Sequence, residues 1–226
     1  MRLLLIRHGQ TPSNVSGAID TAFPGAGLTP LGHEQARSLP EVLSSESISG
    51  IYASRLVRTQ LTAVPLSQAR SLEVSVRDGL EEVSAGELEM RADEAAVQEY
   101  AACIVSWLRG DLDRRMPGGS TGKEFIERYD DGVRAIVDDH DPSDTVAVFS
   151  HGAAIRAFTA WVTGMDPDVA SGLRIMNTGL SHLEGSPDTG WRLARWSTEP
   201  LGGLELEDLR ARDVTGEAAE EAVRGA

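Results

Sequence analysis

Two apolar runs, one at the start of the chain and one in its second half, each stop at a His-Gly pair. The first run covers residues 2–6 and leads to His8, and the second covers residues 145–149 and leads to His151. Short unbroken apolar runs are typical of strands that are buried on both faces of a parallel sheet. Ligands of such sheets bind just beyond the carboxyl ends of the strands. We therefore expect His8 and His151 to share one site.

Helix and strand patterns alternate along the rest of the chain. Thr29 as N-cap and Pro30 at the first helical position begin a helix that runs to about Ser44. Ser54 is expected to cap the next helix. The remaining predicted helices cover about 55–69, 92–109, 121–139 and 153–163, and the remaining strands cover about 50–53, 72–76, 173–184 and 191–196. This alternation predicts an α/β fold, a three-layer sandwich whose mostly parallel central sheet is flanked by helices.

Two stretches depart from the alternation. Residues 84–120 are helical without a strand between them, so they are interpreted as a small cap inserted over the site. Residues 201–226 contain seven acids, three arginines and few large apolar side chains. We expect this tail to be a short surface helix over about 204–212 or mostly disordered. The sequence thus predicts a single domain over residues 1–200 followed by an acidic tail.

Composition excludes several classes of partner. The net charge of −14 disfavours nucleic acid and anionic membranes, although a local arginine cluster can still bind a small anion. No apolar run is long enough to span a membrane, and no secretory signal follows Met1, so we expect a cytoplasmic protein that begins there. The single cysteine, Cys103, excludes an internal disulfide and is interpreted as a core or half-buried thiol rather than a reactive one.

The residues around the two histidines suit phosphoryl chemistry. A phosphoryl group in transfer carries negative charge, so it needs positioned cations and donors, and Arg7 lies beside His8. Gly9 and Gly152 allow the backbone to approach a ligand closely. One neutral imidazole can attack phosphorus while a second holds the phosphate. Taken alone, however, a histidine at a strand end is more often structural.

Five segments of the chain carry a further signal. They are Arg7-His8-Gly9-Gln10-Thr11 with Asn14, Leu28-Thr29 with Gly32, Gln35 and Ala36, Tyr52-Ala53-Ser54-Arg55-Leu56-Val57-Arg58-Thr59 with Thr62 and Ala63, Leu80-Glu81-Glu82 with Gly86 and Glu89, and Phe149-Ser150-His151-Gly152. Together they resemble the histidine phosphatase (phosphoglycerate mutase-like) superfamily, in the order of that family and over about residues 1–185.

The resemblance implies a role for each central residue. His8 would be the nucleophile that becomes phosphorylated, and His151 the second histidine on the phosphate. Arg7 and Arg58 would hold phosphate oxygens, for which guanidinium groups are suited. Glu82 would protonate the leaving alkoxide and then activate water, which requires a raised pKa near neutral pH.

The resemblance also implies a second set of residues and several absences. Asn14, Thr11 and Gly152 would line the phosphate or substrate pocket. Neither a metal nor an organic cofactor is implied, and no spacing in the sequence suggests a metal site. The partner would be a small phosphorylated metabolite, and a homodimer is left open. Of neighbouring pairs, Glu82 is favoured over Glu81, and Arg58 over Arg55.

Hydrolysis is favoured over mutase activity, because the region between Glu82 and His151 is short. Its arginines lie among many acids: Arg91, Arg109, Arg114 and Arg115. Ser120 stands where the family usually has Glu, which leaves the rim of the pocket and the substrate open. The alternatives are phosphoglycerate mutase-type phosphoryl transfer and a catalytically weak protein that binds a phosphorylated ligand.

Overall fold

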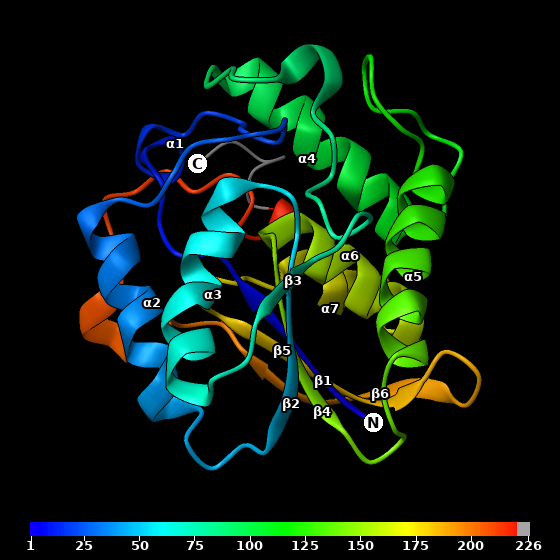
Figure 1. Ribbon diagram of the computed structural model, residues 1–226. Coiled ribbons are helices and arrows are strands. Elements are labelled where there is room, and N and C mark those ends of the chain that lie inside the picture. The colour runs from blue at the N-terminus through cyan, green and yellow to red at the C-terminus, as the bar shows by residue number, and fades with distance from the viewer. Residues whose placement is uncertain (221–226) are drawn as a thin grey trace.

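A computed structural model describes residues 1–220 of the chain. A six-stranded sheet forms the centre of the molecule (Figure 1). The strand order is β3-β2-β4-β1-β5-β6. The first four strands in this order are parallel, whereas β5 and β6 are antiparallel to their neighbours. The predicted α/β fold with a mostly parallel sheet is therefore confirmed. The strands are β1 (Arg2–Arg7), β2 (Ile48–Ala53), β3 (Val74–Val76), β4 (Thr145–Ser150), β5 (Leu180–Ser186) and β6 (Gly190–Ser197).

Helices cover both faces of the sheet, and the alternation of side chains along β1 shows why both faces are buried. Leu4 and Ile6 pack in one core with α2 and α3. Leu3 and Leu5 pack in the other core with α4, α5 and α6. The helices are α1 (Pro12–Ser16), α2 (Pro30–Val42), α3 (Val57–Arg70), α4 (Glu94–Leu108), α5 (Gly122–Asp138), α6 (Gly152–Thr163) and α7 (Pro167–Gly172), with short 3-10 turns η1 (Gly86–Leu88) and η2 (Leu204–Leu206).

The register of the two central strands brings the two histidines together. β1 and β4 are parallel neighbours, and Arg7 lies opposite Ser150. His8 and His151 are the next residues of the two strands, so both emerge at the same edge of the sheet. This edge is the upper one in Figure 1, where α4 crosses above it.

The region expected to form a cap consists of η1, α4 and the loop that leads to α5. It is fastened to the body by a hydrogen bond from the Tyr100 hydroxyl to the Val83 carbonyl (2.9 Å). Gly86 has a φ of +55°, and a side chain there would lie 2.2 Å from the Pro117 carbonyl oxygen. This close approach joins the two ends of the cap. Cys103 is buried in the same core.

Several local predictions are wrong. The strand expected from residue 173 begins only at Leu180, and helices α1 and α7 were not predicted. Ser54 does not cap α3, whose N-cap position is Leu56 without a side-chain cap. Within residues 1–220, every helix is too short or too polar for a membrane span.

The C-terminal segment also differs from its prediction. Instead of a surface helix over 204–212 there is one 3-10 turn, Leu204–Leu206, and Asp213 is 1% exposed. Ala218 and Ala219 are buried as well. The tail therefore folds onto the body as far as residue 220. The part of the prediction that concerns residues 221–226 lies outside the described residues.

Candidate active site

His8 is held as a neutral ring with one nitrogen free. Its Nδ1 lies 2.8 Å from the Gly9 carbonyl oxygen, which can only accept, so the proton of the ring is on Nδ1. The side chain is 2% exposed. Burial, and then the charges of Arg58 and Arg7, hold the pKa of His8 well below its ordinary value. Nε2 therefore carries a lone pair at neutral pH.

His151 lies beside His8 and is held by the opposite ring nitrogen. The two ring centroids are 5.3 Å apart. Nε2 of His151 is 2.7 Å from the Ser54 hydroxyl, while its buried Nδ1 has no hydrogen-bond partner. Burial and the charge of Arg58 lower the pKa of His151 as well. When Ser54 donates to Nε2, the single proton of the neutral ring is on Nδ1, which can donate to a ligand.

Arg58 lies in the first turn of α3 and has two nitrogens that can donate to a ligand. Its Nη2 donates to the Asp20 carbonyl (2.8 Å), and Nη1 lies 3.6 Å from the Asp20 carboxylate. Nε and Nη1 are buried without a hydrogen-bond partner. Because α3 begins where β2 ends, the guanidinium group is carried to the same edge as the histidines.

Arg7 is fully buried, and most of its donors are already used. Nη1 donates to the Ile175 carbonyl (2.8 Å) and to the Asp213 carboxylate, and Nη2 donates to Asp213 (2.5 Å) and to the Thr215 hydroxyl (3.0 Å). Only Nε lacks a partner. No pattern in the sequence predicts that a tail carboxylate lies on this arginine.

Unpartnered donors gather in this one place. Among residues 1–220, eight buried side-chain nitrogen or oxygen atoms lack a hydrogen-bond partner, and four of them belong to Arg7, Arg58 and His151. A buried donor without an acceptor is costly, so a protein keeps several together where a ligand supplies the acceptors. The chemistry of these donors suits an anion with several oxygens.

Glu82 lies at the N-terminus of α6. Its Oε1 accepts from the backbone N–H groups of Val83 (2.9 Å) and Ala154 (2.8 Å), and its Oε2 accepts only from Ala153 (3.2 Å). Burial raises the pKa of Glu82, although these hydrogen bonds and the nearby arginines oppose it. Oε2 has the weaker partner, so it is the oxygen better placed to carry a proton.

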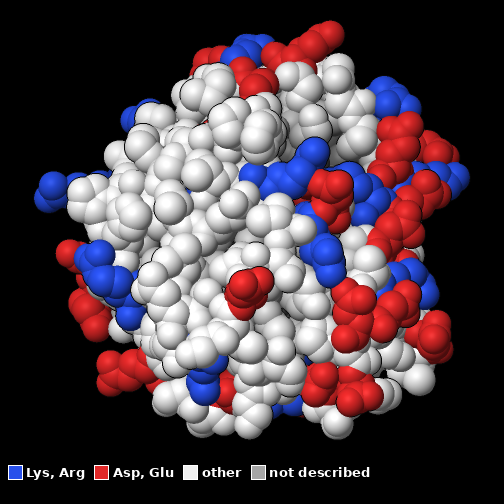
Figure 2. All heavy atoms as spheres, viewed as in Figure 1, with Lys and Arg blue, Asp and Glu red and all other residues white. Residues whose placement is uncertain are grey.

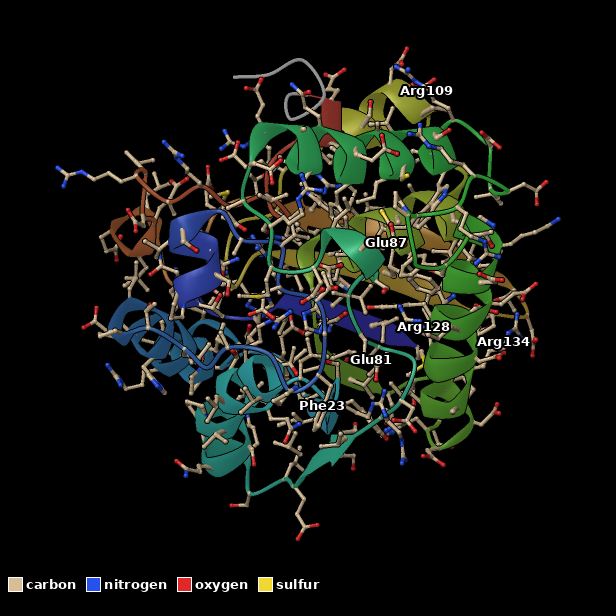
Figure 3. All side chains as sticks on the ribbon, turned by 90° about the horizontal axis from the view of Figure 1, so that it is seen from above. Phe23, Glu81, Glu87, Arg109, Arg128 and Arg134 are labelled. Atoms are coloured by element: carbon tan, nitrogen blue, oxygen red, sulfur yellow. The ribbon has the colours of Figure 1, made fainter. Side chains whose placement is uncertain are left out.

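Glu81 points the other way, and Arg128 explains the difference. Arg128 donates to the Glu81 carboxylate (2.8 Å) and to the backbone carbonyls of Glu81 (3.0 Å) and Glu82 (3.2 Å). Figure 3 shows Arg128 and Glu81 beside one another. Arg55 also binds Glu81 and is half-exposed. Neither Glu81 nor Arg55 is therefore placed at the site.

The start of α1 supplies the polar wall of the site. Thr11 is its N-cap, and Thr11 and Asn14 form a capping box. Asn14 accepts from Thr11 and Asn177 through Oδ1, so its Nδ2 turns to the Asp213 carboxylate (2.9 Å). Asn177 also donates to the His8 carbonyl (3.1 Å). No sequence signal points to Asn177, because it falls where a strand was predicted.

The cavity between these side chains has about 10 Å³ of free space, roughly what one water molecule requires. Gly152 is not among the lining residues, but a side chain there would come within 3.0 Å of Arg7 Nε and 2.4 Å of the Thr215 carbonyl oxygen. Among residues 1–220, no group of three or more His, Cys, Asp or Glu side chains is arranged to hold a metal. The residues that line the cavity are His8, Thr11, Ser13, Asn14, Ala18, Asp20, Arg58, Asp213, Val214 and Thr215.

Comparisons with known proteins find structures of similar fold. A structure of a mycobacterial glucosyl-3-phosphoglycerate phosphatase has a TM-score of 0.74 and 28% identity, covering 88% of this chain and 99% of that one. The α-ribazole phosphatase from Shigella flexneri has a TM-score of 0.69 and 27% identity, covering 88% and 97%.

Sequence relatives include both mutase-like and other proteins. The probable phosphoglycerate mutase GpmB of Salmonella choleraesuis is 27% identical, over 94% of this chain and 98% of its own length. The PE-PGRS family protein PE_PGRS11 of Mycobacterium tuberculosis is 32% identical over 92% of this chain, but the match spans only 38% of its length. The model of the histidine phosphatase superfamily (branch 1) matches residues 3–199. The chain therefore belongs to the histidine phosphatase superfamily.

Proposed function

We propose that this protein hydrolyses small phosphate monoesters through a phosphohistidine on His8, without a metal. The observation that carries the proposal is the free Nε2 of His8, in a site where the buried donors of Arg7, Arg58 and His151 lack acceptors. A neutral nucleophile surrounded by unpaired donors suits the transfer of an anionic phosphoryl group. The proposed substrate is a phosphorylated metabolite.

The first step forms a bond between His8 Nε2 and phosphorus while the bond from phosphorus to the ester oxygen breaks. Arg7 Nε, Arg58 and His151 Nδ1 donate to the phosphoryl oxygens, whose charge they stabilise. Protonated Glu82 gives its proton to the leaving alkoxide. In the second step the Glu82 carboxylate takes a proton from water as that water attacks phosphorus, and the release of inorganic phosphate restores His8.

The arginines of the cap favour hydrolysis over mutase activity. A mutase of phosphoglycerate must bind a carboxylate or a second phosphate next to the one that is transferred. None of the cap arginines lines the cavity, and each pairs with an acid. Figure 3 shows Arg109 at the edge of the molecule, and Figure 2 shows basic and acidic atoms adjoining one another over α5. The pairs are Arg91–Asp93, Arg109–Asp168, Arg114–Glu99 and Arg115–Glu124.

Turnover of p-nitrophenyl phosphate and of a panel of phosphorylated metabolites, measured in EDTA from acidic to neutral pH, tests the proposal. We expect turnover by the wild type and by His33→Ala, whose exposed histidine lies outside the site, and none by His8→Ala. Absence of turnover by the wild type would leave a protein that only binds phosphorylated ligands. Efficient conversion of 3-phosphoglycerate to 2-phosphoglycerate with the bisphosphate activator would instead establish the mutase.

The nucleophile is tested separately from turnover. After brief exposure to a labelled phosphate ester and acid-free denaturation, we expect label on wild-type protein and none on His8→Ala. Label that persists on His8→Ala would mean that another residue is the nucleophile.

A further inference from the structure

The C-terminal segment 213–217 is fixed against the active site by buried hydrogen bonds. Arg156, which is 1% exposed, donates to the carbonyls of Leu173 (2.9 Å), Thr215 (3.2 Å) and Glu217. The Ile175 N–H donates to the Gly216 carbonyl (2.9 Å). The segment therefore forms one wall of the catalytic cavity, to which Asp213, Val214 and Thr215 contribute.

The carboxylate of Asp213 binds two residues beside the proposed phosphate site, one of them the arginine whose Nε the proposed function gives to the phosphate. It accepts from both Nη atoms of Arg7 and from Asn14 Nδ2. Asp213 is 1% exposed, so this ion pair is shielded from water and from screening by salt. An anion of this chain thus lies on two of the residues that would bind an anionic substrate.

The same segment leaves too little room for a substrate. His8 and Arg58 are each 2% exposed, and the cavity beside them has about 10 Å³ of free space, close to the requirement of one water molecule. A phosphoryl group with its oxygens is larger than a water molecule. It can reach His8 Nε2 only if a part of the cavity wall moves.

We propose that Asp213 is a specificity-determining residue, an internal anion that a phosphate ester must displace from Arg7 and Asn14 before it reaches His8. This inference rests on the proposed function. Binding is then an exchange of one anion for another, and the observed affinity is reduced by the fraction of molecules in which the segment is in place. A phosphate dianion offers more charge and more oxygens than a carboxylate, so it displaces Asp213 where weaker anions do not.

Calorimetric titration with inorganic phosphate, which needs no turnover, measures the exchange directly. Asp213→Asn keeps the size of the side chain and removes its charge. We expect it to bind phosphate at least ~10-fold more tightly than the wild type. Glu205→Gln removes one charge from an exposed site of the same tail and should not change the affinity. If Asp213→Asn binds phosphate and the wild type shows no binding, the proposal is also supported. If Asp213→Asn binds phosphate as tightly as the wild type, more weakly or not at all, the proposal is overturned.

Hydrogen exchange of the wild type tests the displacement even if Asp213→Asn does not fold. The amides of Gly216 and Glu217 donate to the Asp213 carbonyl at 3.1 and 3.0 Å. Saturating phosphate should make these amides exchange faster, because the segment moves. Unchanged or slower exchange would mean that Asp213 stays in place and positions Arg7 permanently. Because both measurements use inorganic phosphate, a wild type without esterase activity would refute the proposed function, while the phosphate measurements would still decide whether Asp213 is displaced.

Discussion

At the scale of single residues, the two histidines of the site are held by opposite nitrogens. A backbone carbonyl fixes Nδ1 of His8, and the hydroxyl of Ser54 fixes Nε2 of His151. The free atoms are therefore Nε2 of one ring and Nδ1 of the other. Which nitrogen is bound decides the tautomer, and thereby which ring can attack and which can donate. Ser54, which the sequence suggests only as a helix cap, thus sets the state of the second histidine.

The buried neutral state of His151 predicts how stability depends on pH. Its folded pKa lies below the ordinary value of 6.5, so the unfolded chain takes up the proton first. The free energy of unfolding therefore keeps its full contribution from neutral His151 above that value, and it decreases as the pH falls from about 7 to about 5. We expect His151→Gln, which can keep the bond to Ser54, to weaken the fall in melting temperature over this range. The exposed His33→Gln is the control, and an unchanged slope in His151→Gln would contradict the assignment.

Glu82 predicts a difference between leaving groups. Glu82→Gln should lower kcat for alkyl phosphates by about 10²- to 10⁴-fold, because a poor leaving group needs the proton. Phosphorylation of His8 by activated esters should persist. Because the pKa of Glu82 is raised, wild-type turnover should fall as the pH rises through it, and this limb should vanish in the variant.

A matched control is Glu87→Gln, which changes an exposed acid five residues further along the chain and should leave both kcat and the fall of turnover with rising pH unchanged. If Glu82→Gln slows alkyl and activated esters equally, the carboxyl does not serve as the proton donor.

At the scale of elements, α6 connects the chemistry to the tail. Its first backbone amides, those of Ala153 and Ala154, bind Glu82, and Arg156 one turn later binds three carbonyls around the C-terminal segment. Burial lowers the pKa of Arg156 to about 10, which still leaves it charged at neutral pH. One helix therefore positions both the acid and the wall of the cavity.

Removing this anchor should release the tail. Arg156→Met leaves the carbonyls of Leu173, Thr215 and Glu217 without their donor, so we expect a loss of about 1–3 kcal/mol in the free energy of unfolding. Faster proteolysis within residues 207–217 should accompany it. Urea unfolding and limited proteolysis measure the two effects. In Arg109→Met, an exposed control, the change should stay within ~0.5 kcal/mol; a tail as resistant in Arg156→Met as in the wild type would refute the anchor.

The strands and long helices could be predicted from the sequence because their signals are local. The apolar run before His8 and the Thr29–Pro30 start of α2 each depend on neighbouring residues. The sequence predicts only the ordinary role of a helix cap for Ser54. Its actual partner, His151, lies 97 positions away and leaves no local signal. Asp213 carried no local signal at all, because its partners lie about two hundred residues away and the acids around it are typical of a solvated tail.

At the scale of the whole molecule, a net charge of −14 surrounds a pocket built for an anion. The cations that matter are buried at the edge of the sheet, and those of the cap are neutralised by neighbouring acids. A phosphate ester therefore approaches a molecule of like net charge before it meets Arg58. The long-range field and the local site act in opposite directions.

This opposition predicts an unusual response to salt. Raising the ionic strength from about 10 mM to about 150 mM shortens the screening length from about 30 Å to about 8 Å. We expect kcat/KM for an anionic ester to rise about two- to fivefold, because the repulsion is screened. Initial rates are measured in potassium chloride and in potassium acetate. Screening should act equally in both salts, whereas competition for the site should depend on the anion. A fall in kcat/KM with both salts would show that attraction by the local arginines dominates.

The pairing of Arg7 with Asp213 has a consequence for how the protein is made. The two residues are 206 positions apart, so the arginine leaves the ribosome long before the carboxylate that neutralises it is synthesised. Until residue 213 emerges, the nascent chain has no carboxylate to pair with a buried Arg7. Burying Arg7 alone is costly, so the C-terminal end of β1 is expected to stay solvent-exposed. Completion of the catalytic wall therefore waits until residue 213 has been synthesised, and a shorter nascent chain lacks the site.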